Sequence, residues 1–152
     1  KRITQLQYMF ENRATIVKTF GMTITFTEDG SAVIDMPYNP GLNHAMNGIH
    51  GGVYMTLLDS AAWFTAAAAH EESIWVATSE MSVHLLRPAA NTSLHCVGKI
   101  IKPGKRQDIV EAHLVDGAGQ LIGHGIGTFA VLSEFPMPPL PEGAQPKGTI
   151  KM

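Results

Sequence analysis

Two glycines followed eight residues later by a single carboxylate form the pattern in this sequence with the most potential for chemistry. Gly51 and Gly52 open an Ala-, Leu- and Met-rich stretch that runs to His70, and Asp59 is its one charged residue. Open backbone N–H groups at a helix start suit an anion or a developing oxyanion. A carboxylate among apolar residues is costly unless it is paired or used, so Asp59 is a candidate nucleophile or general base on an acyl carbon. The alternatives are that the glycines permit tight packing and that Asp59 pairs with a buried partner such as His84.

The spacing of these groups limits how they can act together. Gly51 and Asp59 lie eight residues apart, which is roughly 12 Å along the axis of a helix. One acyl carbon cannot contact both groups from the same helix. If both act, Asp59 must come from a second copy of the chain whose helix runs antiparallel to the first. The spacing therefore predicts a site at a dimer interface, with two sites per dimer.

A scaffold must hold such a helix. The stretch 50–70 is rich in helix-favouring residues and contains no proline, so we expect one long buried helix there. Before it, the sequence predicts a short amphipathic helix with Thr4 as its N-cap and Gln7 completing a capping box. It also predicts a β-hairpin with a turn at Glu28-Asp29-Gly30. The expected strands cover residues 22–26, 32–36, 75–86, 93–102, 108–115 and 121–132.

The last four strands, joined by short Gly- and Pro-containing turns, indicate an antiparallel meander. One helix cannot cover both faces of a sheet, so we expect the long helix to lie in the concave face of about five to six strands. This is an α+β domain whose remaining surface pairs with another copy. A single domain is expected over residues 1–135. The Pro-rich segment 136–152 is expected to be an extended arm or disordered.

Composition excludes several classes of protein. The 152 residues are 45% hydrophobic and only 16% charged, which suggests contact with other subunits. A net charge of −2 argues against nucleic-acid binding. Asp59 and the many alanines make the long helix a poor membrane span, and we expect neither a span nor a signal peptide. Cys96 is the only cysteine, which favours a reducing compartment and predicts a cytoplasmic protein.

Metal and nucleotide signals are weak. The sequence has no HxxxH or CxxC pattern, and His84, His95, His113 and His124 fall on separate expected strands. Isolated histidines of this kind are usually structural or surface residues, so we expect no metal site. The glycine-rich segment 123–127 resembles part of a dinucleotide fingerprint, but no helix follows it.

One turn carries concentrated positive charge. Lys102-Pro103-Gly104-Lys105-Arg106 places three cations between two expected strands. Such a turn could bind the phosphates of a coenzyme A arm. A solvated turn explains the same residues equally well.

These features together resemble the hotdog-fold acyl-CoA thioesterases, and among them the phenylacetyl-CoA thioesterase-like (PaaI-like) branch. His50-Gly51-Gly52, with Asp59 nine residues after the histidine, is similar to the HGG…D helix start of that family. The resemblance runs from about Tyr38 to Leu132 and includes Arg87-Pro88-Ala89 and the Gly104-Lys105 turn. It implies a hotdog fold, in which an antiparallel sheet wraps one long helix, and hydrolysis of a CoA thioester without a metal or redox cofactor.

The resemblance also implies roles for single residues. The Gly51 N–H would polarise the thioester carbonyl, and Asp59 of the partner subunit would act as nucleophile or as the base that activates water. Thr78 falls near the position where related enzymes have a Ser or Thr that helps to position the Asp or the water. His50 would mainly hold the turn before the helix.

The chain departs from the family pattern at one position. The family often has Asn six residues before the HGG histidine, where this sequence has His44, and either neighbouring Asn could substitute through a shifted loop. The expected catalytic residues are Asp59, Gly51, Thr78, His44 and Asn47. The expected substrate-binding residues are Asn43, His50, Gly52, Trp63, Arg87, Lys105 and Arg106.

The expected partner is an acyl-CoA substrate with an aryl or medium-chain acyl group. Trp63 could line the acyl pocket, although packing in the core explains Trp63 equally well. The resemblance implies a homodimer with shared sites and a tetramer built as a dimer of dimers. Two other functions stay open. One is a non-catalytic acyl-CoA binding module with the same fold. The other is a hotdog 3-hydroxyacyl thioester dehydratase, in which His50 or His44 would work with Asp59; the HGG helix start favours hydrolysis.

Overall fold

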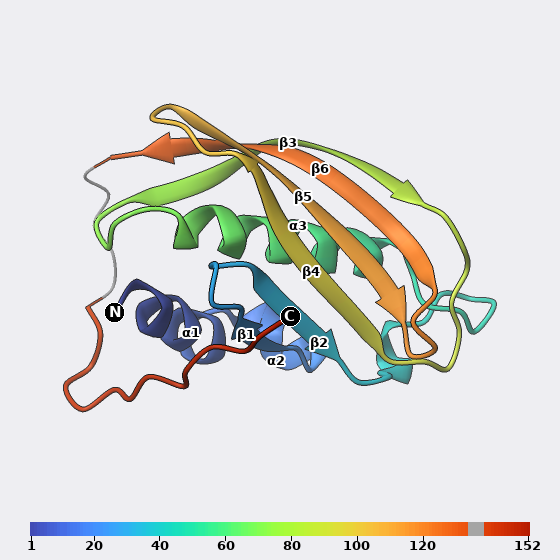
Figure 1. Cartoon of the computed structure of the whole chain (residues 1–152). Helices are drawn as coiled ribbons and strands as arrows, with labels where there is room; N and C mark the ends of the chain where they lie inside the picture. Colours follow the sequence, from blue (N-terminus) through green and yellow to red (C-terminus); the bar gives the residue numbers. More distant parts are fainter. Residues whose placement is uncertain (134–138) are drawn as a thin grey trace.

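The computed structural model describes residues 1–133 and 139–152 and contains one long helix surrounded by a curved sheet (Figure 1). The helical segments are α1 (Arg2–Asn12), α2 (Thr15–Phe20), the 3-10 turn η1 (Pro40–Leu42) and α3 (Gly51–Ala68). The strands are β1 (Thr23–Phe26), β2 (Ala32–Met36), β3 (Trp75–Leu85), β4 (Leu94–Lys102), β5 (Gln107–Asp116) and β6 (Leu121–Leu132). The expected hairpin, long helix and four later strands are confirmed to within a few residues.

The six strands form one antiparallel sheet that wraps around α3 (Figure 1). Along β5, alternate residues face the helix, and Val110, Ala112 and Leu114 are fully buried. On the helix, Leu57 and Leu58 are also fully buried. This is the hotdog arrangement that the sequence resemblance implies.

The predicted meander is wrong for one strand. The sheet order is β1-β2-β4-β5-β6-β3, so β3 pairs with β6 and lies at the far edge instead of beside β4. The segment 86–93 is long enough to carry the chain across the end of the sheet from β3 to β4 (Figure 1). Turn residues show where strands end, but they do not show which strands become neighbours.

The N-terminal region differs from the prediction in two ways. The helix α1 begins at Arg2, so Thr4 lies inside it and the predicted capping box is not formed. Arg2 fixes this helix start instead, because its guanidinium donates hydrogen bonds to Ala67 O at 3.0 Å and Ile74 O at 2.6 Å. A second helix, α2, follows where the sequence indicated only a transition, and it ends at Gly21 in the left-handed region.

The C-terminal arm runs back along the molecule. Lys147 contacts Glu11 on α1, and Ile150 forms a parallel bridge beside β1, where its N–H donates to Phe26 O at 2.8 Å. The predicted boundary between residues 135 and 136 lies outside the described residues. Within the described residues, no helix has the length and hydropathy needed to cross a membrane.

Candidate active site

Asp59 lies in the middle of α3, on the side of the helix that the sheet leaves partly uncovered. Its neighbour along this side, Met55, is 45% exposed, whereas Leu58 is fully buried. The Asp59 carboxylate does not pair with His84. Instead, its Oδ1 accepts a hydrogen bond from Thr78 Oγ1 at 2.8 Å. Two of the expected catalytic residues, the central carboxylate and a hydroxyl on β3, therefore lie together, and their roles stay a prediction.

An irregularity in β3 accounts for the direction of the Thr78 side chain. The pairing of β3 with β6 shifts register between Thr78 and Glu80. Before this bulge, Val76 faces the core, and after it the more buried positions are Met81 and Val83. The bulge lets Thr78 face α3 while Glu80 points to the other side of the sheet. This change in the phase of the apolar residues is visible in the sequence and would have located the bulge.

The environment of Asp59 suits a carboxylate with a chemical role. Burial raises the pKa of the Asp59 carboxyl, and the hydrogen bond from Thr78 partly opposes this by stabilising the ionised form. Desolvation makes an ionised carboxylate a stronger base and nucleophile. A partly desolvated carboxylate with one fixed donor can therefore attack an acyl carbon or activate water.

The start of α3 has one open donor. His50 is the N-cap, and its Nδ1 accepts from Gly52 N–H at 2.8 Å, while its carbonyl accepts from Val53 N–H at 2.9 Å. Within the described residues, the Gly51 N–H has no hydrogen-bond partner. His50 thus holds the turn, as the resemblance implied, and Gly51 is left to bind an oxygen atom.

The loop before α3 carries the three residues expected to contact the thioester, Asn43, His44 and Asn47, and it places them differently. His44 and Asn47 are exposed, and they close a tight turn in which Asn47 N–H donates to His44 O at 3.0 Å and Asn47 has φ +63°. Asn43 lies in a pocket of about 400 Å³ with His50, Gly52 and Val53. Its Nδ2 donates to the Tyr38 hydroxyl at 2.9 Å, and its buried Oδ1 is unpaired. Of the two asparagines, Asn43 is the one placed to contact a ligand at the helix start.

An apolar cavity adjoins Asp59. It measures about 310 Å³ and lies between α3, β3 and the N-terminal helices. Trp63 forms edge-on contacts with Trp75 and Phe64, with ring centroids 4.9 and 4.8 Å apart, and its indole N–H donates to Val76 O. The sequence predicted the contribution of Trp63 but not those of α1 and α2. The further lining residues are Met9, Phe10, Arg13, Ala14, Ile16, Val17 and Ser60.

Comparison of the sequence with models of protein families identifies a family for this chain. The model of the Thioesterase superfamily covers residues 46–122, just over half of the chain, and includes both the start of α3 and Asp59. The chain belongs to the Thioesterase superfamily. Its place in the PaaI-like branch stays a prediction.

Known relatives of the thioesterase agree with this assignment. The "Putative esterase SSO2140" of Saccharolobus solfataricus is 25% identical over 130 residues, 86% of this chain and 92% of that protein. A thioesterase family protein from Silicibacter pomeroyi has 26% identity and a TM-score of 0.82, over 88% of this chain and 99% of that one. A Haemophilus influenzae thioesterase, 18% identical over 86% of this chain and 90% of that one, shares the fold with a TM-score of 0.78. The chain is a thioester hydrolase of the hotdog fold.

The three basic residues expected to bind substrate lie at opposite ends of the long helix of this thioesterase. Arg87 is near the start of α3, because its carbonyl accepts from the Tyr54 hydroxyl at 2.9 Å. Lys105 and Arg106 belong to the β4–β5 turn, which lies near the other end, where the fully buried Asp108 contacts His70. One chain therefore does not bring the expected phosphate-binding turn to the Gly51 N–H.

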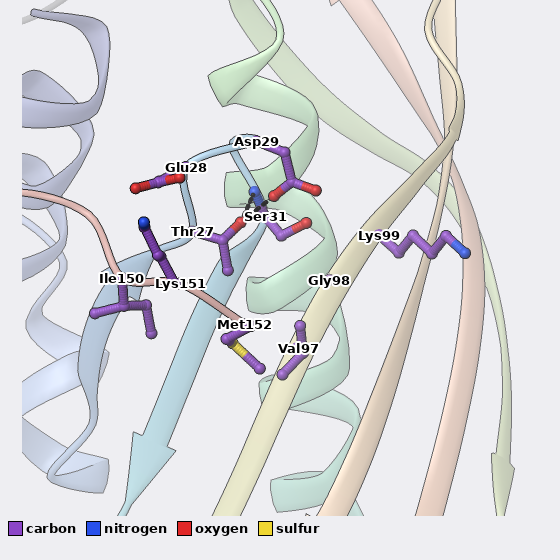
Figure 2. A pocket seen from close by; sticks show the side chains of 10 residues that line it. All are labelled: Thr27, Glu28, Asp29, Ser31, Val97, Gly98, Lys99, Ile150, Lys151 and Met152. Atoms are coloured by element: carbon purple, nitrogen blue, oxygen red, sulfur yellow. Dashed lines mark hydrogen bonds between the residues drawn. The ribbon is translucent and has the colours of Figure 1, made fainter.

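A larger cavity of the thioesterase, about 550 Å³, lies away from these residues (Figure 2). The β1–β2 turn, β4 and the C-terminal residues 150–152 form its walls. Its polar wall is a self-contained turn, in which Thr27 bonds to Asp29 and accepts from Ser31 N–H at 3.0 Å. This cavity results from the docking of the C-terminal arm, and it contains no residue of the expected site.

Proposed function

We propose that the chain hydrolyses acyl-CoA thioesters at two sites shared between the subunits of a homodimer. In each site, the Gly51 N–H polarises the thioester carbonyl. Asp59 of the partner subunit attacks the acyl carbon or activates the attacking water. Water completes the reaction and releases the free acid and coenzyme A.

The observation that carries this proposal is the position of the Asp59–Thr78 pair next to an open sheet edge. β3 is the last strand in the sheet order, it is eleven residues long, and in the described part of the chain it pairs with β6 alone. A long strand at the edge of a sheet is a template for pairing with another strand. Two-fold pairing of β3 with its copy would place the two α3 helices side by side and antiparallel, since each helix contacts its own β3 through Asp59.

An antiparallel pair of helices would also bring the basic turn close to the Gly51 N–H of the other subunit. The β4–β5 turn lies near the C-terminal end of α3. In an antiparallel pair, the turn of one subunit approaches the α3 N-terminus of the other. Lys105 and Arg106 of the partner subunit would then bind the coenzyme A phosphates near Gly51. Arg87 would contact the same arm from the subunit that supplies Gly51.

The cavity beside Asp59 supports an apolar acyl group. Its wall is built from Trp63, Trp75, Phe64 and Phe10, and Asp59 lies at its rim. Aromatic walls with one carboxylate suit a flat aryl or medium-chain acyl group placed for attack at its carbonyl end.

Two local contacts favour hydrolysis over dehydration. A dehydratase would need a free imidazole near Asp59. Here the His50 Nδ1 accepts from Gly52 N–H, and the His44 Nδ1 accepts from Met46 N–H at 3.1 Å. Since Nδ1 accepts in both, a neutral ring carries its proton on Nε2, and neither imidazole keeps a free nitrogen lone pair to act as a base.

The first experiment measures thiol release from a panel of aryl- and alkyl-CoA thioesters. The wild type should turn over at least one of them, and Asp59→Asn should lower kcat by at least about 100-fold while the protein stays folded. Glu28→Gln, a charge-matched change on an exposed turn, should leave kcat unchanged. Full activity in Asp59→Asn, or no turnover of any thioester, would contradict the proposed mechanism and favour a non-catalytic acyl-CoA binding module.

A second experiment tests whether the sites are shared. Gly51→Pro removes the proposed donor from one subunit, and Asp59→Asn removes the carboxylate from the other. After co-refolding of the two inactive variants, a shared site predicts about a quarter of the wild-type activity, because half of the random dimers are mixed and each has one intact site. A site within one chain predicts no recovery. Light scattering on the same samples measures the oligomeric state and tests the predicted tetramer.

A further inference from the structure

The outer face of the sheet gathers histidines from three neighbouring strands. In the strand register, His113 of β5 lies opposite His124 of β6, and His124 lies opposite His84 of β3. Since Ala112 and Leu114 on β5 point into the core, His113 points to the other face, away from α3. Residues far apart in the sequence thus form one row across the sheet.

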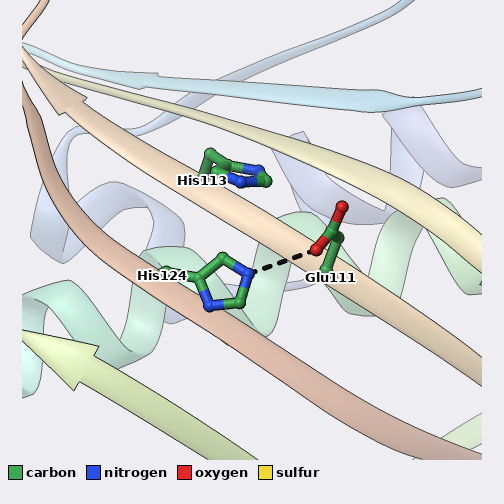
Figure 3. Close-up of side chains that lie close together, drawn as sticks. All are labelled: Glu111, His113 and His124. Atoms are coloured by element: carbon green, nitrogen blue, oxygen red, sulfur yellow. Dashed lines mark hydrogen bonds and ion pairs between the residues drawn. The ribbon is translucent and has the colours of Figure 1, made fainter.

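A carboxylate completes the group. Glu111 lies two residues before His113, on the same face of β5. Its Oε2 is 3.2 Å from His124 Nε2, and the rings of His113 and His124 meet edge-on with centroids 4.9 Å apart. Figure 3 shows the three side chains turned toward one another over β5 and β6. One ligand atom from each residue lies within 4.8 Å of the other two.

We propose that Glu111, His113 and His124 form a binding site for a divalent transition-metal ion of the Zn²⁺ type on the face of the sheet opposite α3. Two imidazoles and one carboxylate form a donor set that zinc accepts, with bonds of roughly 2.0–2.2 Å. Bonds of that length need ligand atoms roughly 3.4 Å apart. The ligand atoms now lie within 4.8 Å of one another, and rotation of the side chains brings them to the shorter separation. The paired strands hold the backbone fixed meanwhile.

Two neighbours define the surroundings of this site. The His84 ring is nearly parallel to the His124 ring, with centroids 6.4 Å apart, so His84 is a candidate for the fourth ligand. Lys99 lies opposite Glu111 in the register of β4 and β5 and is exposed. Its ammonium opposes a bound cation, so Lys99→Ala should tighten metal binding by a few-fold.

Sequence analysis did not reveal this site because the three ligands come from two strands. Glu111 and His113 form an ExH pair, and His124 follows eleven residues later, across a hairpin. Only the register that places His113 opposite His124 brings the three together. The site is also separate from the hydrolytic site, since Asp59 belongs to the helix on the other face of the sheet.

The experiment uses untagged full-length protein, treated with chelator and titrated with Zn²⁺ against a chromogenic competitor. We expect one ion per chain with a dissociation constant of about 1 μM or below. Co²⁺ should produce the visible absorption of a four- or five-coordinate N/O site. His113→Ala and His124→Ala should each weaken binding at least tenfold, and Glu111→Gln should weaken it as well.

Matched variants keep the test decisive. His95→Ala removes another histidine paired with a carboxylate, Asp35, on the same side of the sheet, and it should leave the affinity unchanged, as should Asp59→Asn. His113 is exposed, so its variant is expected to fold, and circular dichroism checks this. Equal binding by the wild type and the His113→Ala/His124→Ala double variant would overturn the proposal. A stoichiometry of one ion per two chains, or a loss of binding in His95→Ala, would also overturn it.

Discussion

Thr78 donates a 2.8 Å hydrogen bond to Oδ1 of Asp59 and so joins the edge strand β3 to the middle of α3. This contact fixes the orientation of the carboxylate, and among the described residues Oδ2 has no hydrogen-bond partner. It also stabilises the ionised form against the effect of burial. In the proposed hydrolysis, the protonation state of Asp59 and the orientation of its carboxylate therefore both depend on Thr78.

Replacement of Thr78 by Val should shift the pH dependence of hydrolysis. The hydrogen bond lowers the pKa of Asp59, so its loss raises that pKa further above the ordinary carboxyl value. Because the proposed mechanism uses the ionised form of Asp59, the acidic limb of the kcat/KM profile should move to higher pH. We expect kcat to fall by about tenfold, as the carboxylate also loses its orientation. Thr78→Ser keeps the hydroxyl and should retain the wild-type profile, and equal profiles for Val and Ser would contradict this role.

Asp59→Asn should stabilise the fold at neutral pH. The pKa of Asp59 is raised in the folded protein, so folding favours the protonated form and wild-type stability falls as pH rises through the range between the unfolded and folded pKa values. The gain in the free energy of unfolding from Asp59→Asn should thus be complete above the pKa of Asp59 in the folded state. It should disappear below the pKa of Asp59 in the unfolded state. It should be small because the carboxylate is partly solvated. Urea unfolding of both proteins across that range measures the difference, and a larger gain at acidic pH would contradict the sign.

Gly51→Pro should test the helix-start donor with little damage to the helix. Gly51 is the first helical residue, where proline is tolerated, and His50 has φ −60° and ψ 137°, which suits a residue before proline. The substitution removes only the Gly51 N–H, so we expect kcat to fall by about 100-fold or more. Gly51→Ala adds a Cβ near Leu85 Cδ1 but keeps the N–H, and it should retain most of the activity. Equal losses in both variants would assign the effect to the Cβ.

The sequence was sufficient for the strands and the long helix because each strand shows its apolar pattern and ends at turn residues. The position of β3 could not be predicted, since Leu85 and Leu94 are separated by a connection that permits more than one neighbour. In the site, Asp59 was evident as the one charge in an apolar helix, and Gly51 as the residue after the cap. Local sequence did not reveal the α2 wall of the acyl cavity or the register that unites His113 with His124, because both depend on contacts between distant segments.

The buried pair His70–Asp108 should contribute more to stability than the exposed pair His95–Asp35. Asp108 has no exposed side-chain surface, and its carboxylate contacts His70 Nε2 at 2.5 Å and Gly104 N–H at 2.9 Å. His70→Ala leaves this buried charge without its main partner and should cost about 3–5 kcal/mol in the free energy of unfolding. His95→Ala should cost less than about 1 kcal/mol, because Asp35 is half exposed. Urea denaturation compares the two variants, and similar losses would show that His70 does not stabilise Asp108.

Gly98→Ala should separate β4 from α3. A Cβ at this position would collide with Thr65 Oγ1 and lie 2.5 Å from Ala61 O. Thr65 cannot simply turn away, since its hydroxyl donates to Ala61 O at 2.7 Å and accepts from Ala32 N–H at 2.9 Å. The strand and helix must therefore move apart, and we expect a loss of about 1–3 kcal/mol in the free energy of unfolding. Lys99→Ala, on the exposed face one residue later, should change stability by less than about 0.5 kcal/mol in the same denaturation experiment. A fully stable Gly98→Ala protein would mean that the helix is not held against β4 at this distance.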